Sequence, residues 1–279
     1  METGDGKQIE YLSGEIRRLR HLLSIHTPPL EALLKRRGFR IYKKEIKDDL
    51  LTPGERFADS WYDMMKRYSF RLFLRDVIKQ GGDFFTAKGI ARYATAQVTG
   101  EYTEYLFQTG MLEKKGGDTY RLERRIKSFG VTLEWFLAET LRREFAAEAA
   151  WGVRFKRPLV GGDYDLVAKI DASILYMEVK SSPPKQIYQN EITEFLRRVD
   201  DLSPEIAVFF MDTELRMKDK IVPMFEEELR KKDPAGPMPL RFHKELFQIA
   251  DRIFIINARD GVASNVEKVL ARYFRRRGF

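Results

Sequence analysis

The sequence contains no cysteine, and only three of its 279 residues are histidines. Without cysteine, the chain forms no disulfides and no thiolate metal sites, as expected of a protein in a reducing cytoplasm. The histidines (His21, His26 and His243) do not pair at a spacing that holds zinc, so any metal would need oxygen ligands. No run approaches the roughly 18 apolar residues that span a membrane, and the amino terminus lacks the layout of a signal peptide. We therefore expect a cytoplasmic protein with no membrane partner.

Positive charge, by contrast, is plentiful. Fifty Lys and Arg residues stand against 42 Asp and Glu residues, a formal net charge of +8. A positive surface concentrates polyanions, so nucleic acid is the expected partner. The alternative is a generally basic protein with no polyanionic ligand. The length allows two domains, and the hydrophobic fraction of 43% is sufficient for buried cores.

Composition and hydrophobic periodicity divide the chain into three regions. Residues 1–66 are expected to form a basic helical N-terminal region rich in Arg and Lys. Residues 67–125 predict three helices followed by two short strands around a Gly-Gly-Asp turn. Residues 126–279 alternate between strand-like and helix-like segments, which predicts an α/β domain whose mixed sheet is flanked by helices.

The second region resembles a winged helix-turn-helix domain, with "YLFQTGMLEKKGGDTYRL" as its third helix and wing. Thr99 is expected to cap that helix, Gly110 to end it, and Phe107 to fill the small core. Such domains usually insert this helix into the DNA major groove. Glu101 and Glu104 on the same helix would be repelled by DNA phosphates, so a packing or dimerisation module remains the alternative.

The stretch "GGDYDLVAKIDASILYMEVKSS" predicts a β-hairpin with a tight turn at Asp171-Ala172. In that register Asp165 lies opposite Glu178, with Cβ atoms about 4.5–5.5 Å apart, and Lys180 lies one pleat further along. Opposed carboxylates destabilise a strand pair unless a cation lies between them. Mg²⁺ favours such an all-oxygen site, with Asp163 as an auxiliary ligand.

The Glu-x-Lys spacing alone is a weak signal, because the chain contains it three times. Only the pair Glu178 and Lys180 sits on a predicted strand, one hairpin after an aspartate. The alternative interpretation is an ordinary hairpin with a solvated charged face, on which Lys180 neutralises its neighbours.

Together with "GVTLE" at the start of a predicted helix, these residues resemble the PD-(D/E)XK nuclease superfamily over residues 129–279. The similarity is strongest to Holliday-junction resolvases and modification-dependent restriction endonucleases. It implies a restriction-endonuclease-like fold in which Glu134, Asp165 and Glu178 bind one or two Mg²⁺ ions, with Mn²⁺ as the alternative ion. It also implies that Lys180 assists the attacking water.

The chain departs from that pattern in one position and leaves another open. Tyr164 stands where the superfamily has a proline before the aspartate. Glu139 lies on the same predicted helix as Glu134 and is the alternative inward-facing carboxylate. The helix after Glu-x-Lys often contributes a polar residue, and neither Gln186 nor Gln189 stands out for that role.

The sequence thus predicts a metal-dependent nuclease, most simply a DNA endonuclease, in which a homodimer would supply the two sites that double-strand cutting needs. Backbone phosphates would meet the basic residues before the hairpin, which are Arg142, Arg143, Arg154 and Lys156. One alternative is a non-catalytic DNA-binding regulator or interaction protein that keeps the nuclease fold as a scaffold. Another is an RNA-processing nuclease.

Overall fold

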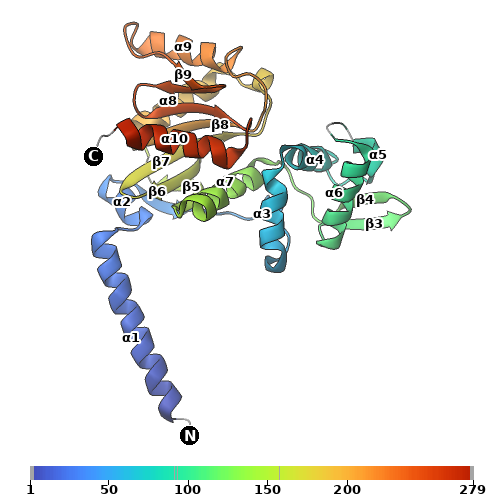
Figure 1. Cartoon of the computed structure of the whole chain (residues 1–279), viewed down its shortest axis with the longest axis horizontal. Helices are drawn as coiled ribbons and strands as arrows, with labels where there is room; N and C mark the ends of the chain where they lie inside the picture. The colour runs from blue at the N-terminus through green and yellow to red at the C-terminus, as the bar shows by residue number, and fades with distance from the viewer. Residues whose placement is uncertain (1–2, 91, 93, 157, 277–279) are drawn as a thin grey trace.

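The computed structural model describes residues 3–90, 92, 94–156 and 158–276 of the chain. It is an α/β protein in which a large mixed sheet has helices on both faces, with a smaller unit of helices and short strands beside it (Figure 1). The helices are α1 (Thr3–His26), α2 (Leu30–Arg36), α3 (Ala58–Lys66), α4 (Tyr68–Lys79), α5 (Ala87–Ile90), α6 (Ala96–Gln108), α7 (Gly130–Phe145), α8 (Gln189–Leu202), α9 (Ile221–Lys232) and α10 (Val262–Arg276). Short 3-10 turns occur at Glu55–Phe57 and Pro184–Gln186.

The large sheet has the strand order β1-β5-β6-β7-β8-β11-β10-β9. Its strands are β1 (Arg40–Lys43), β5 (Glu148–Lys156), β6 (Tyr164–Ile170), β7 (Ser173–Lys180), β8 (Ile206–Met211), β9 (Leu240–His243), β10 (Leu246–Ile249) and β11 (Ile253–Asn257). β8 pairs in parallel with both β7 and β11, and the other neighbours are antiparallel. The expectation of an α/β domain with a mixed sheet is confirmed.

Two hydrophobic cores lie on opposite faces of this sheet. Apolar residues of α7 and α10 pack on one face, and those of α2, α8 and α9 pack on the other. β7 and β8 contribute side chains alternately to the two cores, so both faces of these strands are buried. Strands covered on both faces read as continuous apolar runs, as "IAVFFM" does in β8.

The hairpin of β6 and β7 has the register expected from the sequence. Leu166 pairs with Met177 and Ile170 with Ser173, on either side of a turn at Asp171-Ala172. Asp171 has a left-handed backbone (φ +53°), as a tight turn of this kind requires.

The smaller unit contains α4, α5, α6 and a three-stranded antiparallel sheet of β2 (Phe85–Thr86), β4 (Thr119–Leu122) and β3 (Leu112–Gly116). The three helices and the final strand pair occur in the predicted order, β2 between α4 and α5 was not predicted, and the winged-helix assignment stays a prediction. Thr95, not Thr99, caps α6: its hydroxyl accepts a hydrogen bond from Val98 N–H at 3.3 Å, whereas Thr99 is buried inside the helix. Phe107 was also predicted wrongly, since it is exposed rather than part of the core.

Residues 1–66 are not helical throughout. β1 pairs with β5 at the edge of the large sheet, and Leu30 and Leu34 of α2 are buried in the core that contains α8. α1 projects away from the rest of the molecule (Figure 1). Among the described residues, no helix is both long and apolar enough to cross a membrane. The domain boundaries at residues 66 and 125 stay predictions.

Candidate active site

The two opposed carboxylates of the hairpin lie where β6 and β7 pair. The observed register, extended by one residue beyond Leu166 and Met177, puts Asp165 opposite Glu178. One Asp165 carboxylate oxygen accepts a hydrogen bond from the backbone N–H of Val179 at 2.7 Å. Asp165 is therefore fixed against the neighbouring strand directly beside Glu178.

β5 and β6, which pair next to this hairpin, are bent at the same point. Trp151 of β5 pairs with Leu166 of β6, and both side chains enter the core beneath α7. Two residues along, Val153 pairs with Tyr164, and both enter the opposite core. Side chains two apart on a regular strand share a face, so the alternation is broken here. Gly152, with φ +56°, makes the bend in β5.

Glu134 on α7 reaches the site through this bend. A Cβ atom added to Gly152 would lie 3.8 Å from a Glu134 carboxylate oxygen, and the Gly152 backbone hydrogen-bonds to that carboxylate. Burial, followed by the negative charges of Asp163 and Glu178, raises the pKa of Glu134 to about 8. The other carboxylate considered, Glu139, instead pairs with two arginines of its own helix.

The pKa of Asp165 is raised for the same two reasons. Burial, followed by the negative charges of Glu178 and Glu134, raises the pKa of Asp165 well above its ordinary value. The fold therefore places three carboxylates from α7, β6 and β7 close together, and their proximity disfavours the ionisation of Glu134 and Asp165.

Glu178 is held by three donors. It is 3% exposed, and its carboxylate accepts hydrogen bonds from the Tyr176 hydroxyl and from Arg198 Nη1, the latter at 3.0 and 3.3 Å to its two oxygens. Lys180 Nζ lies 3.0 Å from Glu178 Oε1. Burying a carboxylate is costly unless it is paired in this way.

Lys180 bridges two carboxylates. Its ammonium lies 2.9 Å from Glu191 Oε2 on α8, in addition to its contact with Glu178. Burial alone would lower the pKa of Lys180, but these carboxylates outweigh burial and raise it. Lys180 is therefore a cation at neutral pH and a proton donor rather than a base.

Arg198 and Glu191, which the sequence did not single out, contact Glu178 and Lys180 in the candidate site, whereas no contact of Gln186 or Gln189 with these two residues is seen in the described structure. Glu191 and Arg198 lie on α8, seven residues apart and thus on one face of that helix. Gly162 gives Arg198 its room, because a Cβ atom there would come within 2.8 Å of Arg198 Nη2. One feature of the sequence could have indicated Arg198. It is a cation three residues after Phe195 and directly before Val199, two apolar residues that the structure buries.

The donors suit a hard cation in their chemistry but do not converge on one as they stand. Glu134, Asp165 and Glu178 supply only carboxylate oxygens, the kind of ligand Mg²⁺ takes. The pKa values of Glu134 and Asp165 are raised first by burial and then by neighbouring negative charge, which a divalent cation would offset. In the part of the chain that is described, no three acidic or histidine side chains form a group ready to hold a metal. Glu178, whose oxygens face three donors, would have to exchange one of them for the ion.

Asp163, the expected auxiliary ligand, is paired on the surface. Arg154 contacts it at 2.6 and 2.8 Å, and its side chain is 44% exposed. It remains close enough to raise the pKa of Glu134. Lys156, also on β5, is exposed and makes no ion pair with any other described residue. Lys156 is thus the one predicted phosphate-binding residue of the four with a free charge in the described structure.

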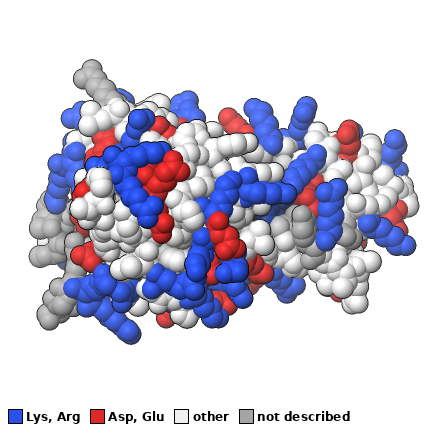
Figure 2. Space-filling view, turned by 90° about the horizontal axis from the view of Figure 1, so that it is seen from above, with Lys and Arg blue, Asp and Glu red and all other residues white. Residues whose placement is uncertain are grey.

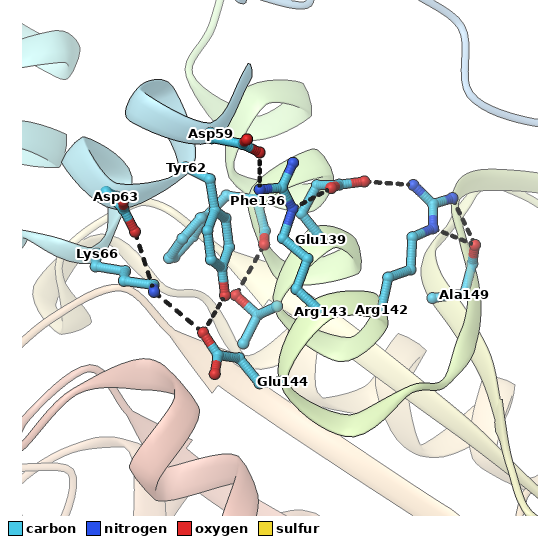
Figure 3. Close-up of polar contacts among 11 residues, drawn as sticks. Asp59, Tyr62, Asp63, Lys66, Phe136, Glu139, Arg142, Arg143, Glu144 and Ala149 are labelled. Atoms are coloured by element: carbon cyan, nitrogen blue, oxygen red, sulfur yellow. Dashed lines mark hydrogen bonds and ion pairs between the residues drawn. The ribbon is translucent and has the colours of Figure 1, made fainter. Parts of the chain in front are cut away.

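Arg142 and Arg143 are occupied within the protein (Figure 3). Arg143 lies 2.8 Å from both Asp59 and Glu139, and Arg142 bonds to Glu139, Glu45 and the Ala149 carbonyl. Paired arginines contribute less to a phosphate-binding surface than free ones. Figure 2 shows the wider pattern on one face, where basic side chains are interspersed with acidic ones.

No protein-family model and no curated protein matches this chain. Among solved structures, it is similar to Can2 from Sulfobacillus thermosulfidooxidans in complex with cyclic tetra-adenylate, with 11% identity and a TM-score of 0.46. It is also similar to protein VC1899 from Vibrio cholerae, with 12% identity and the same TM-score. The matches cover 88% and 90% of this chain but only 60% and 62% of the other chains. At this level of similarity, neither structure assigns an activity to this chain.

Proposed function

We propose that this protein is a Mg²⁺-dependent nuclease of restriction-endonuclease-like fold that hydrolyses phosphodiester bonds, with DNA as its substrate. The observation that carries the proposal is the meeting of Glu134, Asp165, Glu178 and Lys180 at the bend of β5 and β6. Burial and neighbouring negative charge raise the pKa values of Glu134 and Asp165, and clustered carboxylates perturbed in this way are typical of functional sites.

Each residue has a distinct role in this proposal. Glu134, Asp165 and Glu178 would hold the metal, which supplies Lewis acidity and a water activated for attack on phosphorus. Lys180, a cation between Glu178 and Glu191, would stabilise the negative charge that develops on the phosphate oxygens. Arg198, which donates to both Glu178 carboxylate oxygens, would orient Glu178. Lys156, the free cation on β5, would contact a backbone phosphate.

A second candidate function, a non-catalytic nucleic-acid-binding protein, is favoured by one observation. Glu178 already has three hydrogen-bonding donors, so its charge is balanced without a metal. In that case the cluster would stabilise the hairpin, and binding would not depend on divalent ions.

Cleavage assays distinguish the two functions. Supercoiled plasmid, linear duplex, single-stranded DNA and single-stranded RNA are incubated with the full chain in Mg²⁺, Mn²⁺ or EDTA. The nuclease proposal predicts metal-dependent cleavage of DNA that Asp165→Asn abolishes and the surface variant Asp163→Asn reduces only slightly. Metal-dependent cleavage of RNA alone would favour the RNA-processing alternative. Binding without cleavage under every condition would favour the second candidate.

A further inference from the structure

All three tryptophans of the chain line one cavity beside the candidate active site. Trp61 comes from α3, Trp135 from α7 and Trp151 from β5, and the cavity between them measures about 250 Å³. Pockets for drug-sized ligands run to roughly 300–1,000 Å³, so this one suits a single small planar group.

One wall of the cavity contains a buried hydrogen-bond donor without a partner among the described residues. Trp61 is fully buried, yet its indole Nε1 makes no hydrogen bond to any described residue. Buried polar groups without partners are rare and costly. The Trp61 ring packs edge-on against Phe70 and parallel to Tyr105, so this tryptophan forms a rigid wall of the cavity rather than a surface on which a ligand stacks.

The polar lining offers both donors and acceptors. Glu45 and Glu55 supply carboxylates, and Arg142, which is already paired with Glu45, Glu139 and the Ala149 carbonyl, adds positive charge to the lining. Glu45 has a left-handed backbone (φ +54°), its N–H donates to the Trp151 carbonyl at 2.9 Å, and its carboxylate binds Arg142. Strain of this kind at a non-glycine residue concentrates at functional sites. Glu45 is therefore held with its carboxylate beside the tryptophans.

The cavity adjoins the carboxylate cluster through two shared elements. Trp135 directly follows Glu134 on α7, and Trp151 directly precedes the bend at Gly152 through which Glu134 reaches the site. A ligand in the cavity and a phosphate at the cluster would thus contact the same helix and the same strand.

We propose that this cavity, which we call the tryptophan pocket (Glu45, Glu55, Trp61, Trp135, Arg142 and Trp151), binds an unstacked nucleobase of the substrate strand. Trp135 is the half-buried tryptophan of the three and can stack on a base, and the exposed Glu55 carboxylate can accept hydrogen bonds from the edge of a base. A quaternary ammonium group would also favour aromatic rings but would be repelled by Arg142. The inference rests on the proposed nuclease function, since it assumes a nucleic-acid substrate.

Tryptophan fluorescence tests the pocket directly, because every tryptophan of the chain lines it. The full chain in EDTA is titrated with a short single-stranded oligodeoxynucleotide and with the same backbone made entirely of abasic sites. The intact oligonucleotide should quench the emission and bind roughly 5- to 150-fold more tightly than the abasic one, the ratio that corresponds to 1–3 kcal/mol of stacking.

Variants locate the effect. Trp135→Ala, at a half-buried position, should lower the affinity for the intact oligonucleotide to that for the abasic one. Trp135→Phe should restore part of the loss, and Tyr11→Ala, an exposed aromatic on α1, should change neither affinity. Circular dichroism verifies that the variants are folded.

The inference is overturned if the two oligonucleotides bind equally, if neither binds, if Trp135→Ala weakens both alike, or if tetramethylammonium alone quenches the emission. If binding does not depend on the bases but metal-dependent cleavage is seen, the proposed role of the pocket is wrong and the nuclease proposal stands. If binding depends on the bases but no metal-dependent cleavage is seen, the nuclease proposal is wrong and the base-binding role of the pocket stands.

Discussion

Glu178 is a nearly fully buried carboxylate, and its energetics depend on the donors around it. Arg198 is the one donor that comes from outside β7. Arg198→Met should therefore lower the free energy of unfolding by about 1.5–3 kcal/mol, the usual contribution of hydrogen bonds to charged groups. The matched control is Arg197→Met, whose ion pair with Glu194 is exposed and should contribute under about 1 kcal/mol. Urea denaturation measures both, and equal losses would contradict the role given to Arg198.

Glu134 makes stability depend on pH in the absence of divalent metal. Its folded pKa of about 8 lies above its ordinary value of 4.5, so the folded state holds a proton that the unfolded state releases. The free energy of unfolding should then fall as the pH rises from about 4.5 to about 8, by at most about 1.4 kcal/mol per pH unit for this proton. Thermal melts in EDTA across that range, with Glu134→Gln as the comparison, measure the slope. Asp165, whose pKa is also raised, contributes a slope of the same sign, so Glu134→Gln should reduce the slope, and an unchanged slope would rule out Glu134 as one of its sources.

At the residue scale, the two-residue period of strands was sufficient to place Asp165 opposite Glu178. Arg198 could not be chosen from sequence, because its contact depends on how α8 crosses the sheet. The role of Gly152 was also invisible, since a glycine within "WGVRF" does not reveal that it bends a strand toward Glu134.

At the scale of elements, the bend in β5 positions the whole site. Gly152→Ala would put a side chain on a left-handed backbone, which costs roughly 1–2 kcal/mol, and should also weaken activity by shifting Glu134. Gly100 is the matched control, because it lies inside α6 with no atom within 4 Å of an added Cβ. Gly100→Ala should stabilise the protein by about 0.5–1 kcal/mol. Opposite signs for the two substitutions in denaturation are expected, and the same sign would contradict the account of the bend.

Elements with a clear period were predicted closely, and those that depend on long-range pairing were not. The segment "QNEITEFLRRVDDL" coincides with α8, because its apolar residues recur at helical spacing between polar ones. β1 was missed because it becomes a strand only by pairing with β5, more than a hundred residues away. The hairpin of β9 and β10 was missed because Lys244, at its turn, has a left-handed backbone without a glycine signal.

At the scale of the whole molecule, a buried ion pair joins the smaller unit to the large sheet. Arg71 of α4 lies 2.8 Å from Asp212, just after β8, and both side chains are essentially unexposed. The Asp212 N–H donates to the Lys180 carbonyl at 2.8 Å, so this pair lies at the end of the site strand. It ties the position of α4 to the position of Lys180.

Breaking this pair should be costly. Asp212→Ala would leave the Arg71 charge buried and unpaired, for which we expect a loss of about 3–5 kcal/mol. Asp219→Ala, which removes the exposed partner of Arg216, should cost under about 1 kcal/mol. Urea denaturation compares the two variants, and a small loss for Asp212→Ala would show that the contact between the two parts does not rely on this pair.

The account as a whole is tested most directly by the Mg²⁺-dependent nicking rate of supercoiled plasmid, measured for the wild-type chain, Lys180→Ala and Lys185→Ala. Lys185 is an exposed lysine five residues beyond Lys180, so it controls for the loss of one positive charge nearby. We expect EDTA to abolish nicking by the wild-type chain. Lys180→Ala should lower the nicking rate by at least about 100-fold, as for removal of a group that stabilises transition-state charge. Lys185→Ala should leave the rate nearly unchanged. Equal rates for all three proteins, or no metal-dependent nicking by the wild-type chain, would contradict the account.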